Sequence, residues 1–463
     1  GEDRMAKKLW GGRFKKKLDS EILKFTSSIS YDKRLAPYDI EGSIAHAKML
    51  GKCGIISKKD ASRLVQGLKK LKKGALKIDE KYEDIHSAIA DLLKKEVGRV
   101  AENLHAARSR NDQVVLDLRM YCKDEIKNII KVINSLQLCI LSGAKKFSKE
   151  NTTVPSYTHL QQAQCILLSH QLLAYIGMLE RDKQRLGDMF RRIDVMPLGS
   201  SAHRGTSLPI DRFYTAKLLK FSKVSENSID AVSDRDFVAE FLSVIAILSM
   251  HLSRIAEDFI LWSSKEFRYA EGDDAHYTGS SMMPNKKNPD PLEIIRGYSG
   301  EVYGQLVSVL VMMKGLPHTY NRDMQLDKPA LFSAIDKIKD SLSILEKVLY
   351  GIKIDEGKLK EACENEDIFA TDICEYLIKK GYSQKDAHNI AGKMILYSLD
   401  KGKKIKNLSD SELKGFSKDL NSKTIKRLLD PFTSVKSIQS YGGTSPSSVK
   451  RQIKKWESFL TNA

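Results

Sequence analysis

The sequence has few features of a disulfide-rich, zinc-binding or β-sheet protein. Its six cysteines are far apart among 463 residues, and no Cys-x-x-Cys pair occurs. We therefore predict neither a disulfide framework nor a zinc site, and a reducing compartment, the cytoplasm, fits this spacing. No Asn-Gly dipeptide separates alternating apolar runs, so the sequence gives almost no signal for β-hairpins.

The longest uncharged run is too short to span a membrane. Phe241–Ser253 lies between Glu240 and Arg254, whereas a spanning helix needs about 20 apolar residues. We interpret the run as part of a buried core helix. No signal peptide is visible, and we expect no membrane association.

Positive charge exceeds negative charge along the chain. Lysine and arginine number 77 against 59 acidic residues, which gives a formal net charge of +18. A basic chain can bind nucleic acid, a membrane surface or an anionic substrate. Here the lysines are interleaved with acidic residues and no aromatic-studded basic patch occurs. We expect a solvated surface, with steering of an anionic substrate as the alternative, and no nucleic-acid partner.

Hydrophobic residues recur at helical spacing. Between Leu116 and Leu141 the apolar positions follow the i, i+3, i+4 pattern. Long helices are predicted in four proline-free segments: Asp112–Phe147, Gln164–Val195, Asp230–Lys265 and Leu292–Gly315.

Two stretches, Phe237–Trp262 and Leu292–Met313, are apolar on nearly every side. Such helices are buried all round, and helices of other subunits would cover them better than one chain could. We predict an all-α fold of three helical domains whose central long-helix bundle forms a multi-helix core in a homotetramer. The predicted domains are an N-terminal helical domain at 1–112, the long-helix bundle at 113–361 and a C-terminal helical domain at 362–463.

The polar stretch Gly279–Pro291 carries the most specific pattern. Its three prolines exclude a continuous helix, and Asp290 is a good N-cap for a helix that follows. Lys286 and Asn288 thus lie just ahead of a helix N-terminus, a place that favours a carboxylate. The alternative is a surface lysine loop before a well-capped helix.

Gly279–Asn288 resembles the G-S-S-x-M-P-x-K-x-N signature of the fumarase/aspartase superfamily, and its Lys-Lys-Asn-Pro-Asp run resembles the argininosuccinate lyase family. Further stretches resemble this family in the same order along the chain: Leu9–Phe14, Glu83–Ser87, Ala107–Gln113, Tyr157–Gln161, Ser233–Phe237, Gly315–Lys328 and Ser440–Thr444. The resemblance implies a homotetramer in which three regions from three subunits meet at each site. It implies neither a cofactor nor a metal.

The activity implied by the resemblance is a carbon–nitrogen lyase reaction, the reversible elimination of argininosuccinate to arginine and fumarate. By motif position, Ser280 corresponds to the base, with Lys286 stabilising its alkoxide. His159 corresponds to the general acid. Glu293 corresponds to the carboxylate that orients His159, although it also suits a helix cap. The base and acid roles of Ser280 and His159 stay open to exchange.

The resemblance also assigns substrate binding to a set of polar side chains, with Arg110 and His86 as positioning groups. Cations among them, with Lys286, would pair with the substrate's carboxylates. The assigned binding residues are Ser28, Asn111, Thr158, Asn288, Tyr320, Gln325 and Lys328.

Some positions depart from the family pattern: Ala106, Gln162, Cys165 and Leu326 stand where the family more often has Thr, Arg, Pro and Glu. None of them is assigned to catalysis, so they bear on affinity and loop shape. Two alternatives stay open. One is another lyase of the superfamily, such as adenylosuccinate lyase or aspartase, and the other is a catalytically silent, crystallin-like structural protein.

Overall fold

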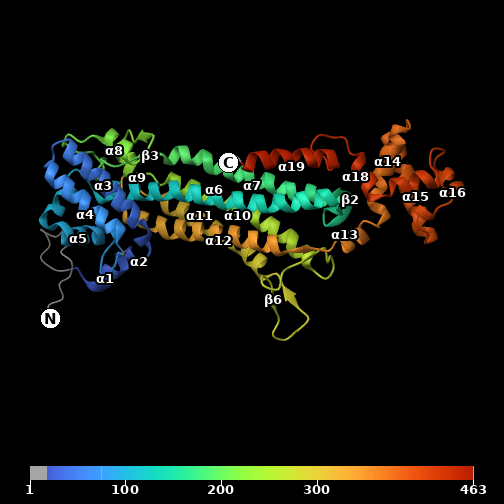
Figure 1. The fold of residues 1–463 in the computed structure, drawn as a ribbon, viewed down its shortest axis with the longest axis horizontal. Helices are drawn as coiled ribbons and strands as arrows, with labels where there is room; N and C mark the ends of the chain where they lie inside the picture. The colour runs from blue at the N-terminus through green and yellow to red at the C-terminus, as the bar shows by residue number, and fades with distance from the viewer. Residues whose placement is uncertain (1–17, 75, 462–463) are drawn as a thin grey trace. The chain divides into compact units, whose positions relative to one another are not determined.

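The computed structural model describes residues 18–74 and 76–461. The family-like stretch Leu9–Phe14 lies outside the described residues. The described chain is mostly helical, with only short strands (Figure 1), so the predicted all-α fold is confirmed.

Contacts divide the chain into two compact units. Unit 1 comprises Gly1–Lys131, Asp182–Leu248 and Tyr298–Lys339, and unit 2 comprises Val132–Arg181, Ser249–Gly297 and Asp340–Ala463. Each unit therefore combines segments that are far apart in the sequence. The division into three domains along the chain stays a prediction.

Five long helices contribute residues to both units: α6 (Arg110–Glu150), α7 (Leu168–Ile193), α10 (Asp236–Ser263), α11 (Asp290–Met313) and α12 (Asp327–Gly351). The first four correspond to the proline-free segments of the sequence, except that Gln164–Leu167 lies in a strand and Asp230–Ser233 in a separate short helix. Helix α12 lies outside the predicted segments. In unit 1, Glu125 of α6 pairs with Lys339 of α12 at 2.9 Å. In unit 2, Ser135 of α6 donates to Glu346 of α12 at 2.7 Å. Polar pairs thus fix the same two helices side by side in each unit.

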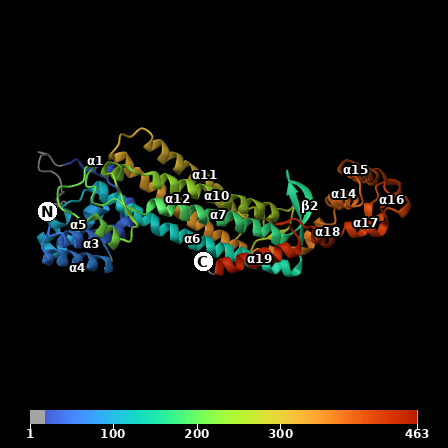
Figure 2. The ribbon, with the colours of Figure 1, turned by 90° about the horizontal axis from the view of Figure 1, so that it is seen from above.

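Unit 1 otherwise contains α1 (Ser20–Thr26), α2 (Ile29–Asp32), η1 (Lys33–Leu35), α3 (Ala36–Lys52), α4 (Lys58–Lys73), α5 (Ile85–Val97), η2 (Gly98–His105), β3 (Val195–Met196), α8 (Arg212–Leu218), β4 (Lys223–Val224), α9 (Ser228–Ser233) and η3 (Arg322–Leu326). Helices α3, α4 and α5 pack together, as both ribbon views show (Figures 1 and 2). Glycine permits close approach here, because a Cβ at Gly67 would lie 2.5 Å from Val97. Ser57 caps α4 by accepting from the Asp60 N–H.

Unit 2 otherwise contains β1 (Thr153–Thr158), β2 (Gln161–Leu167), β5 (Ala270–Glu271), β6 (Thr278–Gly279), β7 (Lys287–Asn288), β8 (Lys353–Ile354), α13 (Glu356–Ala362), η4 (Glu366–Phe369), α14 (Ala370–Lys379), α15 (Gln384–Lys401), η5 (Ile405–Asn407), α16 (Asp410–Phe416), α17 (Ser422–Leu428), α18 (Pro431–Ser437) and α19 (Pro446–Thr461). Two antiparallel strand pairs, β1–β2 and β6–β7, are joined by connections that contain the predicted site residues His159 and Ser280. Helices α14 to α17 surround a separate apolar core that includes Leu377 and Met394.

Helix α10 contains the predicted core run Phe241–Ser253. By length and composition this helix could cross a membrane, but 61% of its most apolar window is buried inside the chain. This burial supports its interpretation as a core helix.

Helix α11 is covered less completely by its own chain. Tyr303, Val307, Leu310 and Val311 recur at helical spacing and are between 41% and 57% exposed. We call these four side chains the α11 stripe. A single copy of the chain therefore leaves part of this apolar helix facing solvent.

Candidate active site

The predicted site residues fall into two groups, one in each unit. Unit 1 contains Ser28, His86, Arg110, Asn111, Tyr320, Gln325 and Lys328. Unit 2 contains Thr158, His159, Ser280, Lys286, Asn288 and Glu293.

Ser28 lies in the connection between α1 and α2 and is buried. Its hydroxyl donates to Asp32 Oδ2 at 2.6 Å, while Asp32 Oδ1 accepts from the Ile85 N–H at 3.1 Å. Burial raises the pKa of Asp32. The backbone N–H of Ser28 donates to the Glu83 carbonyl at 2.9 Å. This serine is therefore fixed against the start of α5.

Gln325 approaches the same connection from η3. Its side-chain amide donates to the Thr26 carbonyl at 3.1 Å, and Arg322 donates to that carbonyl at 2.6 Å. Arg322 also forms an ion pair with Glu83 at 3.0 Å. The structure thus brings Ser28 and Gln325 to one place in unit 1.

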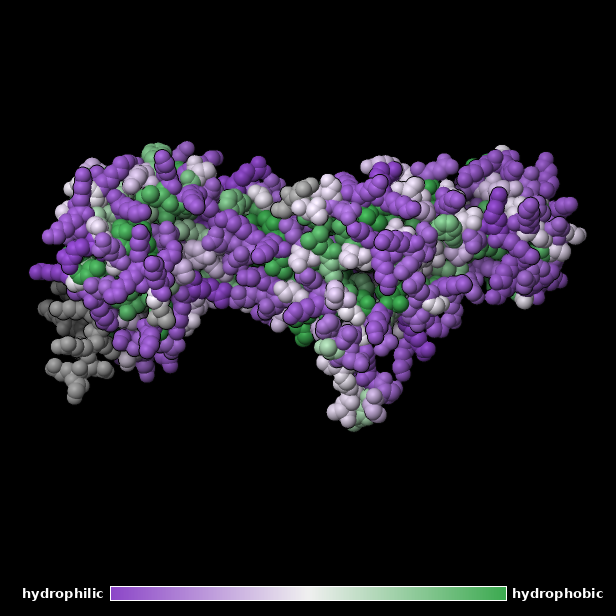
Figure 3. All heavy atoms as spheres, viewed as in Figure 1, coloured by the Kyte–Doolittle hydropathy of each residue, from purple (hydrophilic) through white to green (hydrophobic). Residues whose placement is uncertain are grey.

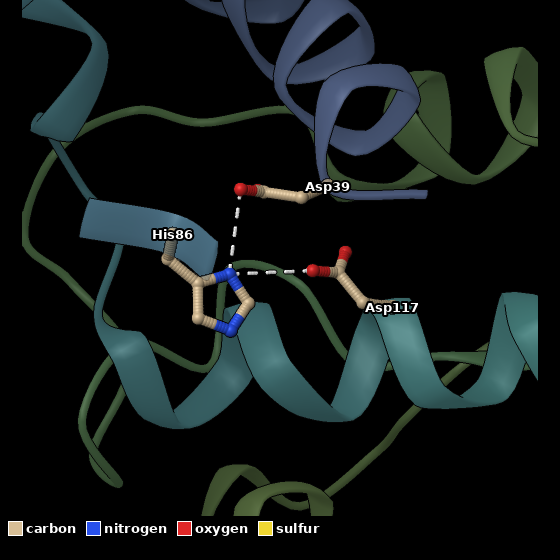
Figure 4. Close-up of side chains that lie close together, drawn as sticks. All are labelled: Asp39, His86 and Asp117. Carbon is tan, nitrogen blue, oxygen red and sulfur yellow. Dashed lines mark ion pairs between the residues drawn. The ribbon is translucent and has the colours of Figure 1, made fainter. Parts of the chain in front are cut away.

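His86 lies between two buried carboxylates (Figure 4). Its Nδ1 is 3.4 Å from Asp39 Oδ2 of α3 and 3.4 Å from Asp117 Oδ2 of α6. Burial alone would raise the pKa of Asp39, but His86 and Arg108 hold that pKa below its ordinary value. The pKa of Asp117 is well above its ordinary value, because of burial and then the charge of Asp39. The two carboxylates that face His86 are therefore unequal, and Asp39 loses its proton more readily than Asp117.

The same three residues could hold a metal ion, since their ligand atoms all lie within 4.8 Å of one another. Both oxygens of Asp117 lack a hydrogen-bond partner. However, the buried guanidinium of Arg108 donates to Ser43 at 2.8 Å and supplies positive charge to this cluster. We therefore interpret the cluster as a buried charge network around His86 and not as a metal site.

Arg110 begins α6 and is already paired within the chain. Its Nε lies 2.9 Å from Asp84 Oδ2, and its two terminal nitrogens donate to Gln113 and Ser87. The neighbouring Asn111 donates to the Ala202 carbonyl at 3.0 Å. These contacts fix Arg110 within unit 1, and its positioning role at the site stays a prediction.

Lys328 is buried at the start of α12. Its ammonium lies 2.8 Å from Asp327 Oδ1, and the other oxygen of Asp327 accepts from Arg235 Nε at 2.5 Å. Burial raises the pKa of nearby Tyr320, which the charges of Arg235 and Arg322 partly offset. A shared carboxylate thus orders two cations beside this tyrosine.

Thr158 and His159 lie in an unusual turn in unit 2. Thr158 pairs with Gln161 across the β1–β2 hairpin, so His159 and Leu160 form a two-residue loop. Their φ angles are 55° and 57°, as a type I′ turn requires. The left-handed conformation costs a non-glycine residue roughly 1–2 kcal/mol. The strained turn holds His159 exposed at the hairpin's tip.

Ser280 begins the loop that joins β6 to β7. Its Oγ accepts from the backbone N–H of Met283 at 3.0 Å and of Met282 at 3.3 Å. Figure 3 shows the loop as a projecting finger, with Met282 86% exposed. Two preorganised donors at one oxygen stabilise negative charge on it.

The other predicted residues of unit 2 follow this loop. Lys286 is exposed, and its backbone N–H donates to the Met283 carbonyl at 3.1 Å. Asn288 pairs with Thr278 in the β6–β7 ladder. Helix α11 begins at Asp290, and Glu293 in its first turn is exposed and 3.9 Å from Arg296. Lys286 and the first turn of α11 thus follow Ser280 closely along the chain.

The structure of one chain does not unite His159 with Ser280. In the described part of unit 2, no hydrogen bond or ion pair joins His159 to Ser280, Lys286 or Glu293, and Figure 1 shows the two hairpins at separate places.

Sequence reasoning did not assign a role to several charged residues that order this site. Arg235 and Asp327 lie within family-like stretches, but their pairing joins residues 92 positions apart. Arg322 also lies within a family-like stretch, whereas Asp32 carries no local pattern that distinguishes it from a surface charge. Contacts between distant segments identify all four.

Comparison with known proteins decides the family. Family models match residues 12–304, described as lyase, and 367–436, described as argininosuccinate lyase C-terminal. An argininosuccinate lyase of Syntrophus aciditrophicus is 47% identical over 97% of this chain and 96% of that protein. One of Pelotomaculum thermopropionicum is 47% identical over 97% of this chain and 98% of its own length. The chain belongs to the argininosuccinate lyase family.

Family membership makes the chain a carbon–nitrogen lyase. Solved structures agree with the fold. EDDS lyase in complex with formate has a TM-score of 0.84 at 28% identity, covering 93% of this chain and 87% of that one. A fumarate lyase from Mesorhizobium sp. BNC1 has a TM-score of 0.76 at 18% identity, covering 94% and 98%.

Proposed function

We propose that this chain catalyses the reversible elimination of argininosuccinate to arginine and fumarate, a step of arginine biosynthesis and the urea cycle. Membership of the argininosuccinate lyase family over nearly the whole chain carries this proposal. The hydrogen bonding at Ser280 supports it, because the loop supplies what an anionic serine oxygen needs.

The first step is removal of the Cβ proton from the succinyl part. A serine hydroxyl is a weak base in water, so its alkoxide needs stabilisation. Two backbone N–H groups already donate to Ser280 Oγ, and Lys286 follows in the same loop. Closure of this exposed loop over substrate would exclude water and strengthen both interactions.

The second step expels the guanidine nitrogen of the future arginine. Negative charge has collected on the succinyl carboxylate, which is then an aci-carboxylate. Its electrons return to form the double bond of fumarate, while His159 donates a proton to the leaving nitrogen. We propose that Glu293 orients His159 and that the N-terminus of α11 with Lys286 receives a substrate carboxylate.

Binding of the substrate's remaining groups falls to the polar residues of unit 1. Ser28 and Gln325 are held by the contacts described above. Gln325 and Tyr320 can donate hydrogen bonds, whereas Ser28 donates its hydroxyl proton to Asp32 and can accept one. Arg110 and Lys328 already have carboxylate partners, so we propose that they order the pocket and share their charge with the substrate. Asn111, Thr158 and Asn288 complete the proposed binding set.

We propose that the active enzyme is a cytoplasmic homotetramer in which different subunits supply His159, Ser280 and the unit 1 residues to one site. The absence of any bond between His159 and Ser280 within the described unit 2 favours this arrangement. The exposed α11 stripe supports it as well, because an apolar face of this kind is stabilised by burial against another copy.

One assay tests the substrate. Fumarate release is followed by absorbance with argininosuccinate, adenylosuccinate and aspartate offered separately. We expect release from argininosuccinate alone. Release from one of the other two would assign the chain to another superfamily activity. A folded tetramer inactive towards all three would support the crystallin-like alternative.

A further inference from the structure

Two buried thiols face each other in unit 2. Cys165 lies in β2 and Cys363 directly follows α13, and their Sγ atoms are 3.9 Å apart. The residues are 4% and 1% exposed. Asn365 donates to Gln162 at 2.8 Å, so the segments that carry the thiols are also joined beside them.

The two thiols are chemically unequal. One thiol donates a hydrogen bond to the other sulfur, and either can be the donor. With Cys165 as the donor, the bond raises the pKa of Cys165 and lowers that of Cys363. By contrast, burial, with the charges of Asp327 and Glu125, raises the pKa of the Cys122 thiol well above its ordinary value. Cys363 is therefore the better nucleophile of the pair, because the thiolate is the reactive form.

We propose that Cys165 and Cys363 form a peroxide-sensitive pair that closes to a disulfide. The Cys363 thiolate attacks one oxygen of hydrogen peroxide, the O–O bond breaks, and the products are a sulfenic acid and hydroxide. The Cys165 sulfur then attacks the Cys363 sulfur, and the sulfenic oxygen leaves as water. Overall, two thiols are oxidised to one disulfide while one hydrogen peroxide is reduced to two water molecules.

The geometry requires a short approach. The sulfurs must close from 3.9 Å to about 2.05 Å, the length of a disulfide. Hydrogen peroxide is small enough to reach a buried site through local opening. The disulfide would covalently link β2, the strand that follows the His159 turn, to the connection between α13 and η4. Any effect on catalysis rests on the proposed function, whereas the cross-link itself does not.

The experiment treats the full-length protein with increasing hydrogen peroxide. Free thiols are counted after denaturation, and tryptic peptides are analysed by mass spectrometry. We expect two of the six thiols to be lost together, one peptide pair joined through Cys165 and Cys363, and full recovery with dithiothreitol. The Cys122→Ser control should form the same cross-link.

Single variants test the assigned roles. In Cys165→Ser the sulfenic acid of Cys363 has no resolving thiol, so dimedone should label Cys363. In Cys363→Ser, Cys165 should stay unlabelled. Circular dichroism checks folding, and alanine replaces serine in any variant that fails to fold.

Two results would overturn the proposal. One is that Cys165 and Cys363 stay reduced at peroxide doses that oxidise the more accessible Cys53 and Cys139. The other is that dimedone labels Cys165 in Cys363→Ser. Fumarate release by the untreated, reduced protein is measured in parallel, and its absence would count against the proposed function and not against the thiol pair.

Discussion

The Ser280 hydroxyl is held by the backbone of its own loop, and this arrangement has two explanations. Two N–H groups donate to Ser280 Oγ, which would stabilise an alkoxide in catalysis but would also stabilise the turn of a purely structural loop. The position of His159 also has two explanations. Its strained turn exposes the side chain as catalysis requires, but the same turn also closes the hairpin in a purely structural role.

Kinetics of variants separates these explanations. We expect Ser280→Ala and His159→Asn each to lower kcat by about 10²–10⁴-fold with little change in KM. The double variant should lose little more than either single variant, because one elimination needs both groups. Steady-state measurement of fumarate release gives kcat and KM for all three proteins.

Two further substitutions serve as controls. Ser281→Ala alters the adjacent exposed serine and should keep the wild-type kcat. Ser280→Asn restores a side-chain acceptor for the turn without a hydroxyl, so it should be as slow as Ser280→Ala. Recovery of activity in Ser280→Asn would mean that Ser280 only shapes the loop.

A second residue-scale prediction concerns pH. His46 is fully buried beside the Ala106 carbonyl at 2.9 Å, and burial lowers its pKa to about 3. The folded state therefore keeps His46 unprotonated at pH values below about 6.5, at which His46 of the unfolded chain binds a proton. The stabilisation is complete above pH 6.5 and is lost as pH falls towards 3. In His46→Gln, the pH dependence of the unfolding free energy between pH 6 and 4 should weaken by about 1.4 kcal/mol per pH unit.

Urea unfolding at several pH values measures this slope. The exposed His203 provides the matched control, since His203→Gln should leave the slope unchanged. An unaltered slope in His46→Gln would show that His46 is protonated in the folded protein. Burial lowers the pKa of His105 to about 4. His105 should therefore leave a smaller pH dependence of the unfolding free energy in every variant.

At the scale of elements, the turn of the β1–β2 hairpin requires left-handed backbone conformations, which glycine adopts more readily than other residues. Leu160 is 69% exposed and has a positive φ, so its side chain gives little packing while its Cβ is strained. We expect Leu160→Gly to raise the unfolding free energy by about 0.5–1 kcal/mol. Gln161→Gly, at a strand position, should lower it by about the same amount. Urea unfolding compares the three proteins, and a Leu160→Gly variant no more stable than wild type would argue against the left-handed turn.

The sequence predicted long helices well because their signal is local. The segment Asp112–Phe147 became α6 (Arg110–Glu150), and Leu292–Gly315 became α11 (Asp290–Met313). The β1–β2 hairpin gave no such signal, since His-Leu replaces the usual Asn-Gly in its turn. Candidate site residues such as Ser280 came from a resemblance in motif, whereas the Arg235–Asp327 pair depends on tertiary contact between distant segments.

At the scale of the whole molecule, the α11 stripe predicts how copies associate. Val307 and Leu310 are more than half exposed in one chain, so Val307→Glu with Leu310→Glu should leave the subunit folded but weaken association. We expect light scattering to show species smaller than a tetramer and fumarate release to fall with them. Asn389→Glu, on the exposed surface of α15, should stay tetrameric. A double variant that remains fully tetrameric would place the interface elsewhere.

An apolar stripe on a strongly basic chain gives the assembly an unusual response to ionic strength. Four copies would carry a formal charge of +72, four times +18, and their mutual repulsion opposes assembly. Salt screens this repulsion and does not weaken the burial of apolar surface. Between about 0.01 and 0.15 M potassium chloride the screening length falls from about 30 to 8 Å. We therefore expect the protein concentration at which dilution halves the activity to become lower as the salt concentration rises over this range. An assembly held mainly by ion pairs would shift in the opposite direction.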